Sequence, residues 1–130
     1  MKKLLLMSVI TLMLGATSAY AKCEGGVEFQ GAINGHTYCR SSTGMTWWAA
    51  FAWCEFQGRE LATMEQMCPN WGGGATVNDV CPNMKEVGKD IWGWSANPNG
   101  SSYAFLVNLF WGGFSYYHYR DNYGCYAVCF

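Results

Sequence analysis

An apolar, tryptophan-rich segment in the first half of this chain constrains its fold more than any other feature. A helix is predicted from Trp47 to Gln57, because Thr46 is a good N-cap and Gly58 can adopt the left-handed conformation that ends a helix. One cysteine, Cys54, lies on this helix, and another, Cys129, is the penultimate residue. These features together indicate a small secreted domain closed by a long-range disulfide.

The first 21 residues have the pattern of a secretory signal peptide. Two lysines give a positive start, Leu4 to Leu14 form an apolar run too short to span a bilayer, and Ala19-Tyr20-Ala21 is a small-x-small cleavage signal. We place the cut after Ala21, so residues 1–21 form the signal peptide and residues 22–130 form one mature domain of 109 residues. The protein is therefore expected to be exported, and to be periplasmic, on the cell surface or secreted.

The charge of the mature chain argues against two classes of partner. Without the two leader lysines, six Lys and Arg remain against nine Asp and Glu, which gives a net charge of −3 and leaves no basic run. Nucleic acid and anionic membranes are not expected partners, because both require clustered cations. No further apolar stretch is long enough to span a membrane. The pattern specifies no oligomeric state.

All seven cysteines follow the predicted cleavage site, and export makes disulfides their expected state. Because seven is odd, one cysteine must stay unpaired or pair between chains. A zinc site is the alternative, but no Cys-x-x-Cys is present and the two histidines, His36 and His118, are isolated in the sequence. The seven are Cys23, Cys39, Cys54, Cys68, Cys81, Cys125 and Cys129.

The first helix and the hairpin before it are the clearest local predictions. Val27–Gln30 and His36–Arg40 alternate like strands around the turn signal Asn34-Gly35. Cys23 and Cys39 would lie near the open end of this hairpin, where they can form a bridge.

The spacing of large apolar residues predicts which side of the first helix is buried. Trp47, Phe51 and Cys54 recur at the spacing of one helix face, with Trp48 beside them. We therefore expect one buried stripe, and we expect Trp47, Trp48 and Trp53 in the core rather than on a ligand platform.

The remaining elements predict an α+β domain with two helices near the front and an antiparallel sheet formed mostly by the second half. Thr63-Met64-Glu65-Gln66 is a capping box for a second helix, which Pro69 ends. A loop follows to Pro82. The expected strands are 91–95, 103–110, 114–119 and 126–130, with a loop at 97–102 and a hairpin connection at 111–113.

These residues resemble C-type lectin-like domains, specifically the small secreted bacterial type, over nearly all of the mature chain. The resemblance rests on Met45-Thr46-Trp47-Trp48-Ala49, Cys54-x-x-x-Gly58, Leu61-Ala62, Trp92-Gly93-Trp94-Ser95 and the late Cys129. It implies a C-type lectin-like fold stapled by disulfides. It also implies that Cys54 pairs with Cys129, and that Cys23 pairs with Cys39.

Two connectivities remain open for the other three cysteines. Proximity in the sequence pairs Cys68 with Cys81, which leaves Cys125 unpaired. In many members of the family a second bridge joins the long-loop region to a cysteine placed roughly where Cys125 stands. The competing arrangement is therefore Cys81–Cys125, with Cys68 free.

The family's calcium-binding triplets have only weak counterparts here. The nearest are Asn97-Pro98-Asn99, which lacks a carboxylate, and Arg120-Asp121-Asn122, in which the order is changed and arginine replaces tryptophan. Calcium takes six to eight oxygen ligands with several carboxylates among them, and only Asp121 supplies one. We expect no metal and no cofactor. A calcium-dependent carbohydrate-binding lectin that uses Asn97, Asn99, Asp121 and Asn122 is the alternative.

No catalytic residues are predicted. Glu55, Glu60 and Glu65 are spaced like solvated helix faces, and His36 and His118 have no carboxylate neighbour in the sequence. Acid–base catalysis requires paired groups with tuned pKa values, and no hydrolase, metalloprotease or phosphate-loop motif is present. The chain is therefore expected not to be an enzyme.

The most informative stretch for function is 114–124, which mixes tyrosine with Ser, Gly, Asn and Arg. Tyrosine supplies a large, stiff contact surface at low entropic cost, as in antibody paratopes, and half of the side chains on a strand point outward. An ordinary aromatic-rich sheet is the alternative interpretation. The expected ligand-binding residues are Asn97, Asn99, Tyr116, Tyr117, His118, Tyr119, Arg120, Asp121, Asn122 and Tyr123.

These observations favour an exported recognition domain that binds protein or glycan without metal, through the surface formed by residues about 95–103 and 114–124. Some bacterial C-type lectin-like domains are variable proteins of diversity-generating retroelements, and the run from Trp92 to Arg120 resembles that pattern. A structural or assembly subunit, with Cys125 as an intermolecular bridge, is a third hypothesis.

Overall fold

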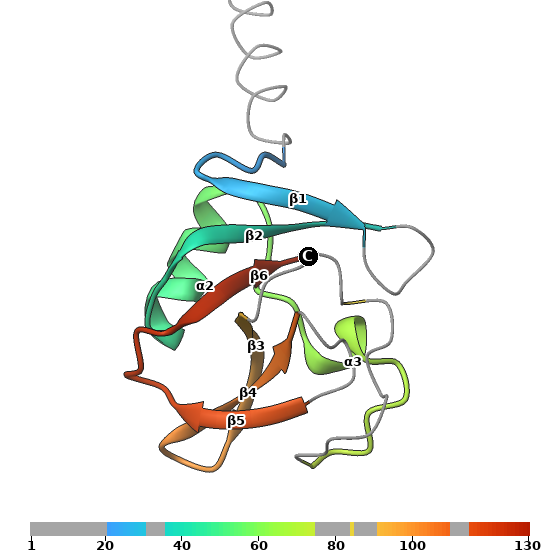
Figure 1. Ribbon diagram of the computed structural model, residues 1–130, viewed down its shortest axis with the longest axis vertical. Helices are drawn as coiled ribbons and strands as arrows, with labels where there is room; N and C mark the ends of the chain where they lie inside the picture. Colours follow the sequence, from blue (N-terminus) through green and yellow to red (C-terminus); the bar gives the residue numbers. More distant parts are fainter. Residues whose placement is uncertain (1–20, 31–35, 75–83, 85–90, 110–114) are drawn as a thin grey trace, which may run out of the picture.

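The protein forms a mixed α+β fold in which two helices pack beside one six-stranded sheet (Figure 1). The computed structural model describes residues 21–30, 36–74, 84, 91–109 and 115–130, and every structural statement below concerns these residues. In chain order the elements are β1 (Gly26–Gln30), β2 (Thr37–Gly44), α2 (Trp47–Phe56), α3 (Met64–Met67), β3 (Trp92–Asn99), β4 (Tyr103–Asn108), β5 (Ser115–Tyr119) and β6 (Cys125–Cys129).

The closing strand β6 joins two parts of the sheet, whose strand order is β1-β2-β6-β3-β4-β5. It pairs antiparallel with β2 and parallel with β3, whereas the other neighbouring pairs are antiparallel. The prediction of an antiparallel sheet is therefore wrong for one pair. The reason is geometric: β2 and β3 run in opposite directions, and a strand inserted between them must run parallel to one of them.

The first helix begins and ends close to where the sequence predicts. The Thr46 hydroxyl accepts a hydrogen bond from the Ala49 amide at 3.2 Å. Gly58 has a φ of +67°, the left-handed conformation that stops a helix at low cost. The second helix begins with the predicted capping box, in which Thr63 and Gln66 each bond the other's backbone amide. Both helix starts are thus confirmed.

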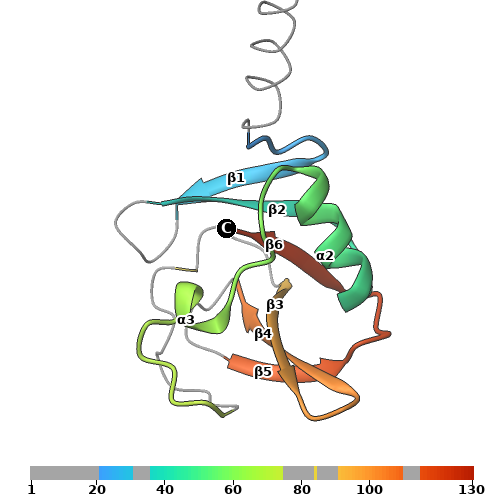
Figure 2. The same cartoon turned by 180° about the vertical axis from the view of Figure 1, so that it is seen from behind.

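The buried side of α2 differs from the prediction. Trp47, Ala50 and Cys54 are buried, whereas Phe51 is 38% exposed and Trp48 is 60% exposed. Trp53 is half-buried. The expectation that Phe51 and Trp48 belong to the core is therefore wrong. Because α2 is apolar on all sides, its periodicity does not select the buried face, and close packing of the helix on β6 decides it (Figure 2).

Two buried tryptophans link the start of α2 to β3 through reciprocal hydrogen bonds. The Trp47 indole donates to the Ser95 carbonyl at 2.7 Å, and the Trp94 indole donates to the Met45 carbonyl at 2.8 Å. Both rings are buried, so each N–H needs a partner within the protein. This exchange fixes the start of α2 against β3.

Two disulfides link distant parts of the chain, and they are the two that the family resemblance implies. Cys54 on α2 is bonded to Cys129 on β6, and Cys23 is bonded to Cys39 on β2. Cys39 and Cys129 are also partners in the β2–β6 register. The two bridges therefore converge on the same point of the sheet and tie α2, β2, β6 and the N-terminal segment together.

The other cysteines rule out one of the two remaining connectivities. Cys68 is disulfide-bonded, and its predicted partner, Cys81, lies outside the described residues. Cys125 is free and buried. The alternative in which Cys125 is bonded and Cys68 is free is therefore wrong.

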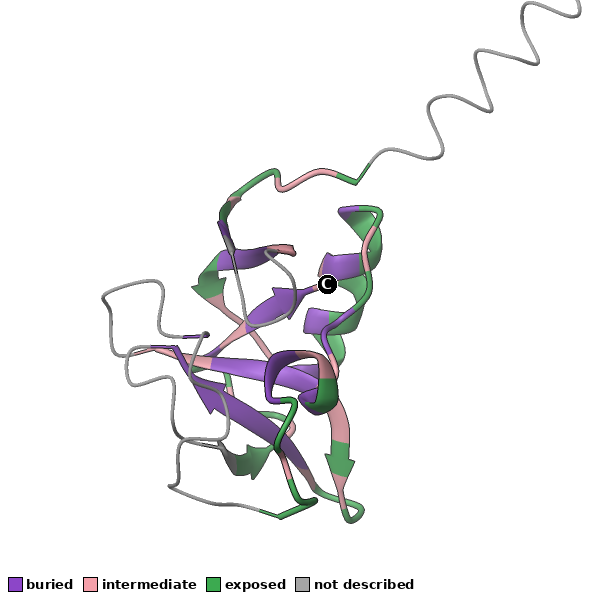
Figure 3. Cartoon of the chain, turned by 90° about the vertical axis from the view of Figure 1, so that its right-hand side faces the viewer, coloured by how far each residue is buried: buried purple, intermediate pink, exposed green. Residues whose placement is uncertain are grey.

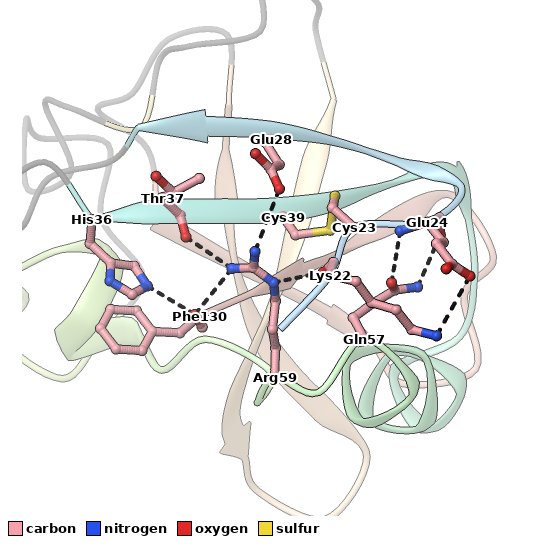
Figure 4. Close-up of polar contacts among 10 residues, drawn as sticks. All are labelled: Lys22, Cys23, Glu24, Glu28, His36, Thr37, Cys39, Gln57, Arg59 and Phe130. Atoms are coloured by element: carbon pink, nitrogen blue, oxygen red, sulfur yellow. Dashed lines mark hydrogen bonds and ion pairs between the residues drawn. A yellow bond between two sulfur atoms is a disulfide. The ribbon is translucent and has the colours of Figure 1, made fainter. Parts of the chain in front are cut away.

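A polar junction at the C-terminal end of α2 orders the start of the described chain (Figure 4). The Arg59 guanidinium donates to the carbonyls of Lys22 at 2.8 Å and Thr37 at 3.0 Å, and it lies 3.8 Å from a Glu28 carboxylate oxygen. The Gln57 side chain exchanges two hydrogen bonds with the Glu24 backbone. These side-chain contacts connect β1, β2 and the residues before β1 to the C-terminal end of α2.

Strand β3 is longer than predicted. It runs through Asn99, and Pro98 and Asn99 pair with Ala104 and Tyr103 of β4. The expected loop therefore begins at Gly100 (φ +71°) rather than at Asn97, and a break in register between Trp94 and Pro98 accommodates the proline. The strand is extended by its pairing with β4, a contact that the local sequence of β3 does not predict.

Several sequence predictions fall on residues that the structure does not describe. They include the signal peptide up to residue 20, the turn at residues 34–35, most of the loop before Pro82 and the connection at residues 111–113. Within the described ranges, no helix has the length and apolarity needed to cross a membrane.

Candidate functional site

Arg120 organises one end of the sheet, just after β5. Its guanidinium donates to the Tyr103 carbonyl at 2.9 Å and to the Gly100 carbonyl, and its backbone amide donates to the Ser102 carbonyl at 3.0 Å. These bonds close the turn between β3 and β4 onto the end of β5. A single planar guanidinium reaches two carbonyls because its donors diverge in a fixed fork.

The same arginine connects this turn to the start of α2. Its guanidinium lies 4.7 Å from the centroid of the Trp47 ring and 5.6 Å from that of Trp48, within the range of cation–π attraction. The Arg120 carbonyl also accepts from the Trp47 amide at 2.9 Å. Arg120 is among the predicted ligand-binding residues, and these contacts show that its side chain also holds the turn between β3 and β4 in place.

Tyrosines gather on the β4–β5 ladder beside Arg120. Tyr117 and Tyr119 lie two residues apart on β5 and therefore on the same face of the strand, and Tyr103 is the register partner of Tyr119. The Tyr103 ring centroid lies 5.2 Å from that of Tyr117 and 4.5 Å from that of Tyr119. Tyr117 is 36% exposed and Tyr119 is 53% exposed. Three rings therefore support one another while two of them face solvent.

A hydrogen bond between the Tyr103 and Tyr119 side chains raises the pKa of Tyr103, and smaller contributions come from burial and from the neighbouring tyrosines. Tyr103 was not named among the individual ligand-binding residues, although it ends one of the two stretches predicted to form the binding surface. Tyr103 is the first residue of β4, which pairs with the tyrosine-rich strand. Its contact with Tyr119 follows from the strand register, which the sequence alone does not give.

Two hollows adjoin these rings. One, of about 190 Å³, is lined by Tyr103, Tyr117, His118 and Tyr119. The other, of about 290 Å³, has Trp48 of α2 and Tyr119 among its walls. Its remaining lining residues are Ser101, Ser102, Arg120 and Asp121. Tyr119 borders both hollows, so it is the central side chain of this surface.

Two of the predicted asparagines use their side-chain oxygens to hydrogen-bond backbone amides. The Asn97 side-chain oxygen accepts from the Met64 amide at 2.8 Å, so Asn97 caps α3. The Asn122 side-chain oxygen accepts from the Gly124 amide at 2.6 Å and forms a local turn. Both amide oxygens already serve the fold. Asn99 is half-buried on β3 opposite Tyr103.

Other predicted site residues have simpler surroundings. Asp121 and Tyr123 are exposed, Tyr123 at 77%. The His118 ring accepts a hydrogen bond from the Tyr119 amide at 2.8 Å. Tyr116 lies on β5, but its side chain is outside the described residues. Among the described side chains, no three His, Cys, Asp or Glu groups come together as a possible metal site.

Cys125 is poorly placed for exchange with another chain. It is 5% exposed, and burial raises the pKa of its thiol to about 12. Disulfide exchange requires an accessible thiolate, so this environment opposes the hypothesis of an intermolecular bridge at Cys125.

Comparison with protein-family models and with curated proteins finds no match to this chain.

Proposed function

We propose that this chain is an exported recognition domain with a C-type lectin-like fold, which binds a protein or glycan ligand without metal. The ligand would contact a tyrosine surface formed by Tyr103, Tyr117 and Tyr119 with His118, together with the exposed ring of Tyr123. The observation that carries the proposal is the packing of Tyr103 between two half-exposed rings, because it pre-orders a large aromatic contact area.

The physical argument is one of entropy and surface. Binding orders mobile side chains at a cost, and rings that already pack against one another have less freedom to lose. The exposed Ser101, Ser102 and Asp121 beside Tyr119 supply hydrogen-bonding groups at the rim. Aromatic anchors with a polar rim are the usual composition of a recognition surface.

The fold assignment within this proposal draws on the residues that carry the resemblance. Trp47 and Trp94 come from its two tryptophan motifs, and they exchange the indole hydrogen bonds described above. The Cys54–Cys129 and Cys23–Cys39 bridges match the pairings that the resemblance implies. The disulfides also fit an oxidising compartment.

A binding screen tests the function. The chain from Lys22 to Phe130 would be applied to glycan arrays and to arrays of cell-surface proteins, with and without EDTA. We expect a ligand whose binding persists in EDTA and is lost in the double variant Tyr117→Ser, Tyr119→Ser. Val27→Ser is the matched control, because Val27 is 38% exposed on β1, at the opposite edge of the sheet.

Two outcomes would contradict the proposal. Loss of binding in EDTA would favour the calcium-dependent lectin. Binding that survives the double tyrosine substitution would place the ligand elsewhere.

The diversification hypothesis has a separate test in the flanking DNA. A near-duplicate of the 3′ end of the coding sequence beside a reverse-transcriptase gene is the expected result. Adenine positions in that duplicate should correspond to the codons of Tyr117, His118 and Tyr119. Without such a duplicate, the tyrosine surface would be an invariant binding surface.

A further inference from the structure

Helix α2 is apolar on both of its sides. Its inner side is buried, whereas Figure 3 shows that the other side faces outward, away from the strands. On that outer side Trp48 is 60% exposed, Phe51 38% and Phe56 64%, which is unusual for large apolar side chains of a soluble domain. We call the exposed residues the α2 outer face. They are Trp48, Ala49, Phe51, Ala52, Glu55 and Phe56.

The α2 outer face has an internal symmetry. Trp48 and Phe56 each lie four residues from Ala52, so the three residues form one i±4 ridge with a small residue between two large rings. Along this ridge, another helix can approach closely only at Ala52. If that helix carries the same ridge and runs antiparallel, its large rings meet the large rings of the first at both ends.

We propose that a second copy of this chain covers the α2 outer face, by antiparallel packing of α2 on α2 with Ala52 at the two-fold axis. In this arrangement Trp48 of each copy packs on Phe56 of the partner subunit. The interface is self-complementary, as two-fold symmetry requires, because each ring both gives and receives the same contact.

Charge supports a copy of this chain over an unrelated apolar partner. Glu55 is the single charged residue of α2, and it lies towards the C-terminal end. Arg120 stacks against Trp48 at the N-terminal end. Lys22 lies over the last ring of α2 at the C-terminal end, but it is paired with Glu24, so Glu55 carries the charge that is not balanced there. Antiparallel packing therefore brings each Glu55 towards the end of the helix where the partner's Arg120 lies, whereas parallel packing would place like charges together.

The available area predicts a weak dimer. Large aromatic side chains bury about 200 Å² each, so the exposed parts of Trp48, Phe51 and Phe56 amount to roughly 300 Å² per copy. A groove of about 320 Å³ beside the helix, with Leu61 and Ala96 in its lining, offers further contact. The total is below the ~1,200 Å² of a standard interface. The dimer should therefore dissociate on dilution.

Cross-linking at the two-fold axis is the sharpest test. Ala52→Cys would place two thiols close together across the axis, and mild oxidation should give a covalent dimer on a non-reducing gel. Ala49→Cys is the matched control, because it is equally an exposed alanine of α2. In the antiparallel pair, position 49 of one copy lies six residues from position 49 of the other, about 9 Å along the helix, which exceeds the reach of a disulfide.

Sedimentation equilibrium of the mature chain up to about 1 mM gives the second test, since an association of ~1 mM affinity is still visible there. We expect a reversible dimer that Phe56→Ser weakens about tenfold or more, since it removes one buried aromatic contact per copy. Tyr117→Ser, which removes a partly exposed ring on the edge strand β5, should leave the dimer unchanged. A monomer throughout, with Ala52→Cys no more cross-linked than Ala49→Cys, would overturn the proposal and assign the face to a different partner. No ligand enters either test, so the result is independent of the proposed function.

Discussion

The two parts of the sheet that meet at β6 and β3 are held together by different means. On one side, β1, β2, β6 and α2 are joined by two disulfides and by the hydrogen bonds of Arg59 and Gln57. On the other, β4 and β5 present stacked tyrosines, and Arg120 holds the adjoining turn without a covalent tie. The difference separates a scaffold whose residues are constrained by packing from a surface whose outward side chains contribute little to stability.

The largest expected effect is on the scaffold side. Replacing both Cys54 and Cys129 by alanine removes a bridge between residues 75 positions apart, and loop entropy predicts a loss of about 4 kcal/mol in the free energy of unfolding. Urea denaturation of the variant and the parent measures this loss. The single variant Cys125→Ala is the control, because it removes a buried cysteine that forms no bridge. Equal stability of the double variant and the control would mean that the bridge is not the main tie between α2 and β6.

The second prediction concerns the contact between the two parts. Trp94→Phe removes the indole donor to the Met45 carbonyl and leaves a gap in a fully buried site. We expect a loss of about 2–4 kcal/mol in the free energy of unfolding. Thermal unfolding checks the magnitude. Trp48→Phe tests the comparison, because this exposed ring should cost less than about 1 kcal/mol.

The third prediction concerns Arg120, which holds the turn beside β4 and β5 without a covalent bond. Arg120→Met keeps an apolar stem against the tryptophans but removes the bonds to the Tyr103 and Gly100 carbonyls. A loss of about 1–2 kcal/mol is expected, together with faster hydrogen exchange of the amide at position 120. Asp121→Asn, at an exposed neighbouring position, should change stability by no more than about 0.5 kcal/mol. If exchange at position 120 does not change, the guanidinium is not what closes the turn.

The smallest effect is a change in titration on the tyrosine surface. Tyr119→Phe removes the hydrogen bond that raises the pKa of Tyr103, so that pKa should move down towards the usual value for tyrosine. Absorbance titration of the phenolate measures it. Tyr117→Phe, which keeps the hydrogen bond, should produce a smaller downward shift.

The sign of the linked stability follows from the same bond. Because folding raises the pKa of Tyr103, the contribution is complete below the unfolded tyrosine pKa of about 10 and is lost as pH rises through the folded value. Folding stability of the parent should therefore fall more than that of Tyr119→Phe above pH ~10. A parallel fall in both proteins would contradict this assignment.

Local chemistry accounts for the parts of the fold that were predictable. Thr46, Thr63 and Gly58 act through the amides or dihedrals of their immediate neighbours, so their effects can be read from short segments. The tyrosine-rich run was also recognisable as a strand with outward rings. In contrast, Asn97 appears in the sequence as a loop residue and a possible ligand, but in the fold it caps α3 from a strand about thirty residues away.

Some properties of this protein were determined by its sequence alone: where its helices begin, where most of its strands lie, and that its cysteines suit an oxidising compartment. The tertiary structure decided which side of α2 is buried, which direction β6 takes beside β3, and that Tyr103 joins the rings of β5. The physical reason is the range of the forces involved. Caps and turns are satisfied by atoms a few residues away, whereas burial and strand pairing depend on surfaces that meet only when the whole chain has folded.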